Sequence, residues 1–171
     1  MKQSYVLLLS VTATALAFAG PLVADTLSVP SAAKPAYTLE APAKWQTKVN
    51  AEDESVEATA PGEHAYLSAW MVSDGDKKNL AGDIEKTLAD SMKKVDPGSK
   101  QETMDVNGNS FTMVRGTGLD KREGGKVSFE VAIFSAGGDK VGIVYTDWDT
   151  NAPAALTDEL KSIIKSIKVT K

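Results

Sequence analysis

The chain has 171 residues, with 23 acidic against 19 basic side chains and a formal net charge of −4 at pH 7. A chain with this balance lacks the basic stripe that nucleic-acid binding needs, and its surface is not built for anionic lipid. It contains no cysteine, so no disulfide can form and no lipid can be attached to an N-terminal cysteine. We therefore expect one ordinary domain that its core alone holds together.

The first 24 residues have the pattern of a secretory signal peptide. Residues 5–19, YVLLLSVTATALAFA, form an apolar run that is too short and too weakly apolar for a comfortable membrane span. Ala17 and Ala19 give one small-x-small cleavage site, and cleavage after Ala24 is an alternative. We expect a periplasmic, soluble protein that is not a lipoprotein, with an uncleaved anchor as the alternative. The predicted signal peptide, flexible leader and folded domain are residues 1–24, 25–35 and 36–171.

The first elements of the domain are predicted to be strands. Tyr37 and Leu39 alternate with polar neighbours, and Pro42 breaks the strand that they begin. Residues 55–60 form a short predicted strand that ends at a Pro-Gly pair. Residues 64–72, HAYLSAWMV, are apolar on both sides of an extended chain. That pattern is typical of a central strand with both sheet faces covered.

The period of the apolar residues changes over residues 80–95. The apolar positions recur every three or four residues, as one helical stripe, at Leu80, Ile84, Leu88, Met92 and Val95. Asn79 is a suitable N-cap, and the Pro-Gly pair at 97–98 would end the helix. We predict an amphipathic helix that packs on the sheet.

Four strands joined by short turns are predicted next, over residues 100–106, 110–119, 126–135 and 140–148. Turns this short require antiparallel pairing. A second apolar stripe, from Leu156 to Ile167, predicts a C-terminal helix. Two amphipathic helices and a sheet that is apolar on both faces predict an α+β fold. Its expected architecture is a three-layer α/β/α sandwich around a mostly antiparallel sheet.

The stretch DWDTNAPAALTD, residues 147–158, has the spacing of a calcium-binding loop. The residues at its ligand positions are Asp147, Asp149, Asn151 and Asp158. Two features differ from such a loop. Ala152 stands where the loop needs glycine, and the element predicted before the loop is a strand instead of a helix. A strand-to-helix junction explains the same residues, because Pro153 suits the first turn of a helix and Thr150 or Asn151 can cap it. We predict no metal and no cofactor, with calcium binding as the alternative.

Residue types that could perform catalysis are few. His64 is the only histidine in the sequence, and it begins a predicted strand with no nucleophile motif beside it. The acidic residues 52–54 are typical of a solvated turn rather than of an acid–base pair. We predict that the protein is not an enzyme, with an uncharacterised hydrolase as an alternative.

The segment DKREGG, residues 120–125, is predicted to form the most protruding charged turn. Such a turn most often only connects the two strands of a hairpin. A contact with a partner protein is the alternative, and its candidate residues are Lys121, Arg122 and Glu123.

The order of these elements and three short motifs resemble the PsbP-like family, and within it the DcrB-like proteins of the bacterial envelope. The motifs are a P-x-x-W strand end from Pro42 to Trp45, a V-x-G-x-x-F hairpin at Val106, Gly108 and Phe111, and the final IIKSIKV. The resemblance covers residues 36–170 and implies a PsbP-like fold. DcrB-like proteins are often lipoproteins, whereas this chain has no cysteine to acylate.

The resemblance also implies a class of function. Members of the family bind or assist other proteins and perform no chemistry of their own. We therefore predict a non-enzymatic exported protein that binds or assists another protein or an envelope component. The alternatives are a periplasmic protein that binds a small ligand or calcium, and the hydrolase.

Overall fold

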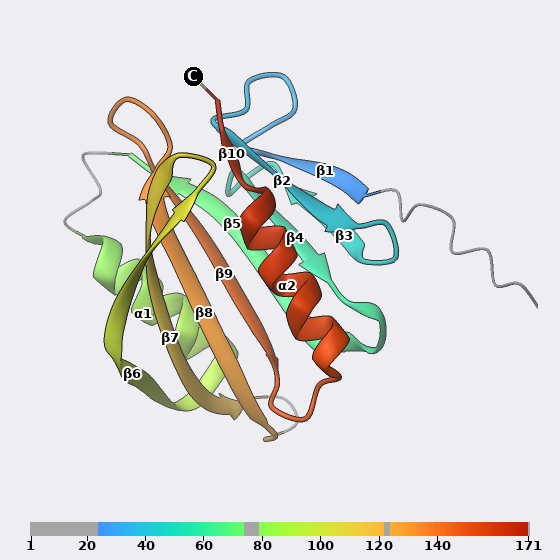
Figure 1. Ribbon diagram of the computed structural model, residues 1–171. Coiled ribbons are helices and arrows are strands. Elements are labelled where there is room, and N and C mark those ends of the chain that lie inside the picture. The colour runs from blue at the N-terminus through green and yellow to red at the C-terminus, as the bar shows by residue number, and fades with distance from the viewer. Residues whose placement is uncertain (1–23, 74–78, 122–123, 171) are drawn as a thin grey trace, which may run out of the picture.

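The main element of the fold is a seven-stranded sheet (Figure 1); the computed structural model describes residues 24–73, 79–121 and 124–170. All neighbouring strands pair antiparallel. Their order is β3 (Gln46–Asn50), β4 (Ser55–Thr59), β5 (Ala65–Val72), β9 (Val141–Asp149), β8 (Lys126–Ser135), β7 (Asn109–Asp120) and β6 (Met92–Val106). The predicted antiparallel pairing of the last four strands is therefore confirmed, and β5 is a central strand as expected.

A second, smaller sheet has the order β1 (Ala24–Val29), β2 (Tyr37–Pro42) and β10 (Lys168–Val169). Strand β1 pairs antiparallel with β2 along its whole length, from Ala24 opposite Pro42 to Val29 opposite Tyr37. The prediction of a flexible leader over residues 25–35 is therefore wrong for its first half. The physical reason is burial, because Leu27 and Val29 point into the core at every second position.

Two helices lie on opposite faces of the large sheet. Helix α1 (Leu80–Ser91) covers one face, and helix α2 (Ala154–Ser166) shares the other face with the small sheet (Figure 1). A short 3-10 turn (Pro61–Glu63) precedes β5. Leu88 of α1 is buried, as predicted, and Ile163 of α2 and Ile167, the residue after α2, are almost fully buried. No helix in the described residues is long and apolar enough to cross a bilayer.

The predicted three-layer α/β/α sandwich is wrong, because the fold is dominated by its antiparallel strands. The sheet of seven strands is about 29 Å wide at about 4.8 Å per strand spacing. A helix of 12 residues is about 18 Å long and about 10 Å wide, so one helix cannot form a layer over such a sheet. On the α2 side, β1, β2 and β10 supply much of the cover instead.

The first predicted helix ends earlier than its apolar period suggested. Helix α1 stops at Ser91, and the chain from Met92 is a strand that pairs with β7. Met92 is buried against Gly118, where an added Cβ would stand 2.6 Å from the Met92 sulfur. From Met92 to Pro97, pairing with β7 thus replaces the hydrogen bonds of a helix. A helix could not continue through Pro97, because proline is not tolerated in a helix interior.

Candidate functional site

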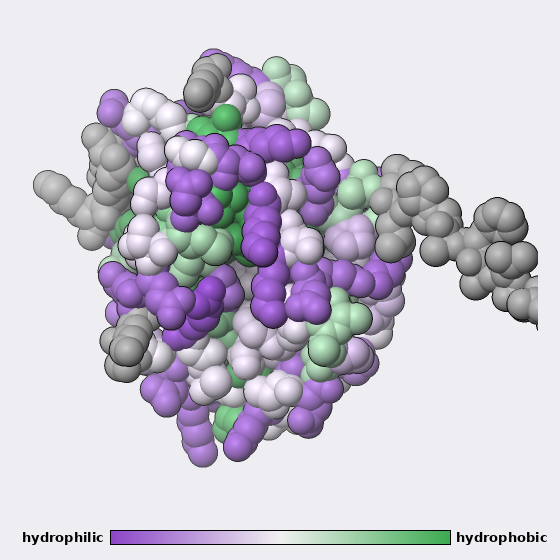
Figure 2. Space-filling model, viewed as in Figure 1, coloured by the Kyte–Doolittle hydropathy of each residue, from purple (hydrophilic) through white to green (hydrophobic). Residues whose placement is uncertain are grey.

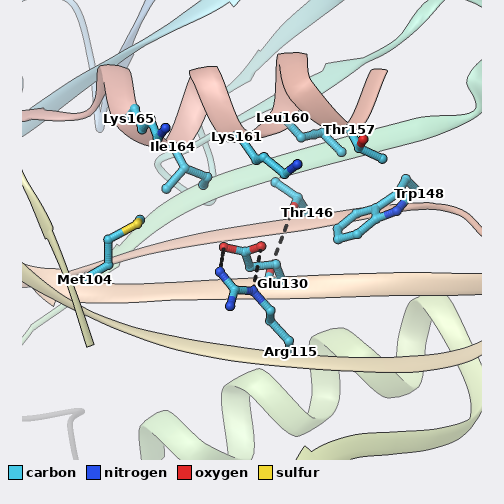
Figure 3. Close-up of a pocket in the computed structure, with 10 residues that line it drawn as sticks. All are labelled: Met104, Arg115, Glu130, Thr146, Trp148, Thr157, Leu160, Lys161, Ile164 and Lys165. Carbon is cyan, nitrogen blue, oxygen red and sulfur yellow. Dashed lines mark hydrogen bonds and ion pairs between the residues drawn. The ribbon is translucent and has the colours of Figure 1, made fainter. Parts of the chain in front are cut away.

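A groove of about 420 Å³ lies between α2 and the sheet face formed by β6, β7, β8 and β9 (Figure 3). Its apolar residues are Met104, Trp148, Leu160 and Ile164, and its polar residues are Arg115, Glu130, Thr146, Thr157, Lys161 and Lys165. Although polar residues are more numerous among these, most of the surface that lines the groove is apolar. In the space-filling view, hydrophobic residues show between hydrophilic ones beside α2 (Figure 2).

Helical periodicity explains how α2 forms one wall of this groove. Ile163 and Ile167 anchor the helix in the core, with 1% and 0% of their surface exposed. Leu160 and Ile164 are four residues apart at the edge of the same apolar stripe, so they face the groove. Lys161 follows Leu160 directly and is therefore rotated outward to the rim.

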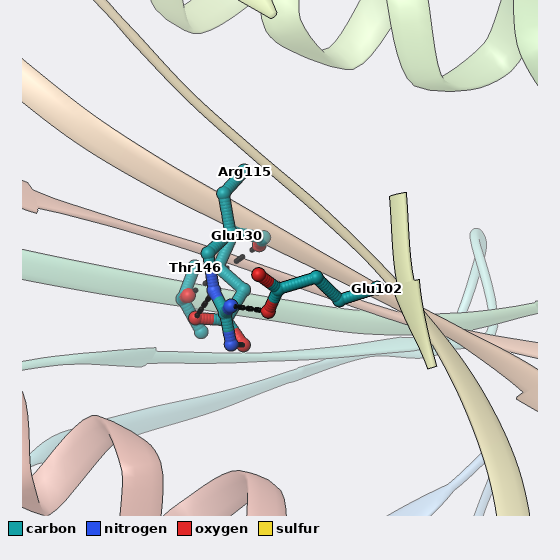
Figure 4. A network of polar contacts seen from close by, with 4 residues as sticks. All are labelled: Glu102, Arg115, Glu130 and Thr146. Atoms are coloured by element: carbon teal, nitrogen blue, oxygen red, sulfur yellow. Dashed lines mark hydrogen bonds and ion pairs between the residues drawn. The ribbon is translucent and has the colours of Figure 1, made fainter. Parts of the chain in front are cut away.

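A polar row crosses the floor of the groove. Thr146 on β9, Glu130 on β8 and Arg115 on β7 stand directly opposite one another in the sheet register (Figure 4). The Arg115 Nε donates to Glu130 Oε2 at 3.1 Å, and Nη2 donates to Oε1 at 3.4 Å. This two-point contact fixes the plane of the guanidinium. The Glu130 hydrogen bond is the main cause that raises the pKa of Arg115, against a smaller opposing effect of burial.

Glu102 on β6 brings a second carboxylate to Arg115. The Nη1 of Arg115 pairs with the Oε2 of Glu102. The two carboxylates differ in their surroundings, because the Glu102 side chain is 58% exposed and that of Glu130 is 14% exposed. Glu130 thus belongs to the groove floor, whereas Glu102 reaches Arg115 from solvent. At the rim, Lys161 Nζ lies 3.1 Å from Asp158 Oδ1.

The structure does not bring the residues of the calcium-loop alternative together. Asp147 accepts a 2.5 Å hydrogen bond from the Tyr145 hydroxyl, and Asp149 Oδ2 lies 2.8 Å from His64 Nδ1. Both acids face the α1 side of the sheet, like Tyr145, whereas Asp158 lies on α2. Asn151 is exposed in the turn before α2. Within the described residues, no three metal-binding side chains are clustered.

The capping of the two helices also differs from the prediction. Pro153 takes the N-cap position of α2, so Thr150 and Asn151 do not cap it. The Thr150 hydroxyl instead donates to the carbonyl of Lys126 at 3.3 Å. Asn79 has the N-cap position of α1 but makes no side-chain cap hydrogen bond.

Of the three candidate partner-binding residues, Lys121 is described, whereas Arg122 and Glu123 lie outside the described residues. Lys121 is exposed, and its backbone N–H donates to the carbonyl of Ser91 at 3.1 Å. Lys121 therefore lies at the end of α1, on the side of the sheet opposite to the groove. A partner contact at this turn stays a prediction.

A second hollow of about 600 Å³ lies on the α1 side, around His64 and Tyr66. Its acidic lining residues are Glu57, Glu63, Asp90, Asp120, Asp147 and Asp149. Burial, followed by the charge of Glu57, raises the pKa of Tyr66 to about 12. His64 is paired with Asp149, but its side chain is 57% exposed and no hydroxyl bonds to its Nε2 among the described contacts. The hydrolase alternative gains no assembled triad here.

Sequence reasoning missed the Arg115–Glu130–Glu102 network altogether. Its members are far apart in the sequence and come together only through the pairing of three strands. One signal was present, because Arg115 and Glu130 are charged residues in the interior of two predicted strands. Such a charge usually has a partner on the neighbouring strand.

Comparisons with known proteins identify the fold but no relative by sequence. No family model matches the chain, and a search of curated proteins finds no match. Mog1p, a Ran-binding protein of Saccharomyces cerevisiae, is similar in structure, with a TM-score of 0.55 at 11% sequence identity. The aligned region covers 86% of this chain and 96% of Mog1p. This chain therefore shares the fold of Mog1p.

Two further structures have the same fold. LpqN of Mycobacterium tuberculosis, described as involved in cell envelope biogenesis, gives a TM-score of 0.53 at 12% identity and covers 90% of this chain and 88% of LpqN. A Bacteroides thetaiotaomicron protein gives a TM-score of 0.53 at 12% identity over 81% of this chain, which spans 47% of that protein. At these identities, the similarity shows the fold alone.

Proposed function

We propose that the protein is an exported periplasmic binding protein, without chemistry of its own, that holds another protein or an envelope component in the α2 groove. The observation that carries this proposal is the groove itself. Its apolar walls, Met104, Leu160 and Ile164 among them, surround a few polar groups that the sheet fixes in place. Such a combination is the usual composition of a binding site.

Three further features support the proposal. The polar groups on the groove floor already bond one another, with Glu130 between Arg115 and Thr146, so the row is suited to orienting a bound molecule. The apolar run over residues 5–19 supports export. The neighbours Mog1p, which binds Ran, and LpqN, which takes part in envelope biogenesis, are compatible with a binding role. Membership of the DcrB-like branch is part of the proposal, and the motifs at residues 42–45 and 106–111 support it.

Site-specific photo-crosslinking in the cells that produce the protein tests the proposal. A photoreactive residue would replace Lys161 at the groove rim, and the matched control would replace Lys86, an exposed lysine of α1 on the opposite face. We expect a defined adduct at Lys161 and none at Lys86, with mass spectrometry showing whether a protein or a smaller envelope molecule is attached. Equal labelling at both positions, or labelling at Lys86 alone, would contradict a binding role for this groove.

A further inference from the structure

The register of the strands gives the groove a length. Met104 stands opposite Phe111, Phe111 opposite Phe134, and Phe134 opposite Gly142 of β9. Trp148 is six residues further along β9 than Gly142. At about 3.3 Å per residue, the levels of Met104 and Trp148 are about 20 Å apart along β9. Met104 and Trp148 are thus apolar lining residues far apart along the strands.

The polar row divides this distance unequally. Thr146, which marks the row on β9, is four residues from Gly142 and two from Trp148. The row therefore stands about 13 Å from the Met104 level and about 7 Å from Trp148. Met104 and Ile164 line the groove on the longer side of the row, where an apolar chain would lie with its head at the row.

The charges of the groove favour an anionic head. The lining holds three cations, Arg115, Lys161 and Lys165, and one acid, Glu130. Two of these cations are paired with acids beside the groove, Arg115 with Glu102 and Lys161 with Asp158. Within the described residues, Lys165 has no ion-pair partner. Lys165 is therefore the lining cation that is open to an anionic head.

Arg115 already holds a carboxylate where such a head would bind. Its Nε and Nη2 are committed to Glu130 on the groove floor, whereas Nη1 pairs with Glu102. Because the Glu102 side chain is 58% exposed, it can return to water at little cost. A ligand carboxylate could then take its place on Nη1 without breaking the Glu130 contact.

We infer that the groove binds a single-chain amphiphile with a carboxylate head, that is, a long-chain fatty carboxylate. The carboxylate pairs with Arg115 Nη1 in place of Glu102, beneath Lys161, and the chain lies between Met104 and Ile164. The volume of about 420 Å³ is within the range of about 300–1,000 Å³ of small-molecule sites. The inference rests on the proposed function of the groove.

Binding of laurate by the purified full chain tests the inference, with dodecanol as the uncharged probe of the same chain length. Titration calorimetry below the micelle-forming concentration would measure both. We expect laurate to bind at least about tenfold more tightly than dodecanol, because a charge-assisted contact is the stronger kind. Glu102→Gln should tighten laurate binding by about two- to fivefold, the range of a screened ion pair, and leave dodecanol binding unchanged.

The control variant is Glu40→Gln, which removes the same charge at an exposed glutamate outside the groove, paired with Lys168. It should leave laurate binding unaltered. Failure to bind laurate, equal affinity for laurate and dodecanol, or no gain with Glu102→Gln would overturn the inference. A protein adduct at Lys161 without laurate binding would overturn the inference alone, whereas absence of both adduct and laurate binding would overturn the proposed function as well.

Discussion

Replacing Arg115 by methionine should destabilise the protein more than replacing its partner Glu130 by glutamine. The two residues make one ion pair but differ in exposure, since the Arg115 side chain is 47% exposed and the Glu130 side chain 14%. Arg115→Met leaves a carboxylate without its cation on the groove floor. Glu130→Gln leaves a guanidinium that water reaches and that Glu102 still binds.

The magnitudes follow from this asymmetry. An ionised group left unsatisfied when largely buried costs about 1–3 kcal/mol, so Arg115→Met should lower the free energy of unfolding by that amount. Removing one partner of a fully buried ion pair costs about 3–5 kcal/mol. The cost is smaller here, because water reaches Glu130 from the groove. Glu130→Gln should cost about 0–1 kcal/mol, the range of an exposed pair.

Urea denaturation of the two variants and the parent protein measures these differences from the midpoints, provided that the slopes agree. The double variant Arg115→Met with Glu130→Leu should recover most of the stability that Arg115→Met loses, because it removes the stranded charge. Equal losses in the two single variants, or a larger loss for Glu130→Gln, would refute the reasoning from exposure.

Four other outcomes are expected. Leu88→Ala under α1 should lower the free energy of unfolding by about 2–5 kcal/mol in urea, and a loss under about 0.5 kcal/mol would mean that α1 does not pack as described. Leu27→Ala in β1 should cost about 2 kcal/mol, whereas a leader without structural role would give no change. Millimolar calcium should not raise the melting temperature above that in chelator, and a rise of several degrees would restore the calcium alternative. The pKa of Tyr66 is raised to about 12, so its contribution to stability is fully present below about pH 10 and is lost as the pH rises towards 12. An ultraviolet titration should therefore show one late-ionising tyrosine fewer in Tyr66→Phe than in the parent protein.

Local patterns in the sequence determined the type of most elements. Alternation placed the strands that became β4 to β9, and the helical stripes placed α1 and α2, because side-chain period follows directly from backbone geometry. The short turns fixed the antiparallel pairing of the last four strands. Export and the cleavage site depend on the first 24 residues and stay predictions.

Tertiary packing decided the elements whose local signal was weak or ambiguous. Residues 25–29 look like part of a polar leader, yet β2 gives them a strand partner and the core buries Leu27 and Val29. Met92 continues a helical stripe, yet the pairing with β7 makes it the start of a strand. In both places the hydrogen-bonding partner is distant in the sequence, so local propensity could not reveal it.

The candidate site shows the same division. The sequence singled out residues 147–158 and the turn at 120–125, because the polar and charged residues of each lie close together in the sequence. The groove depends instead on residues from four strands and one helix, and the Arg115–Glu130 contact exists only because β7 and β8 pair in one register. A shift of that register by one residue would turn the two side chains to opposite faces of the sheet. The sequence by itself therefore determined which elements form, whereas the tertiary structure decided which side chains meet.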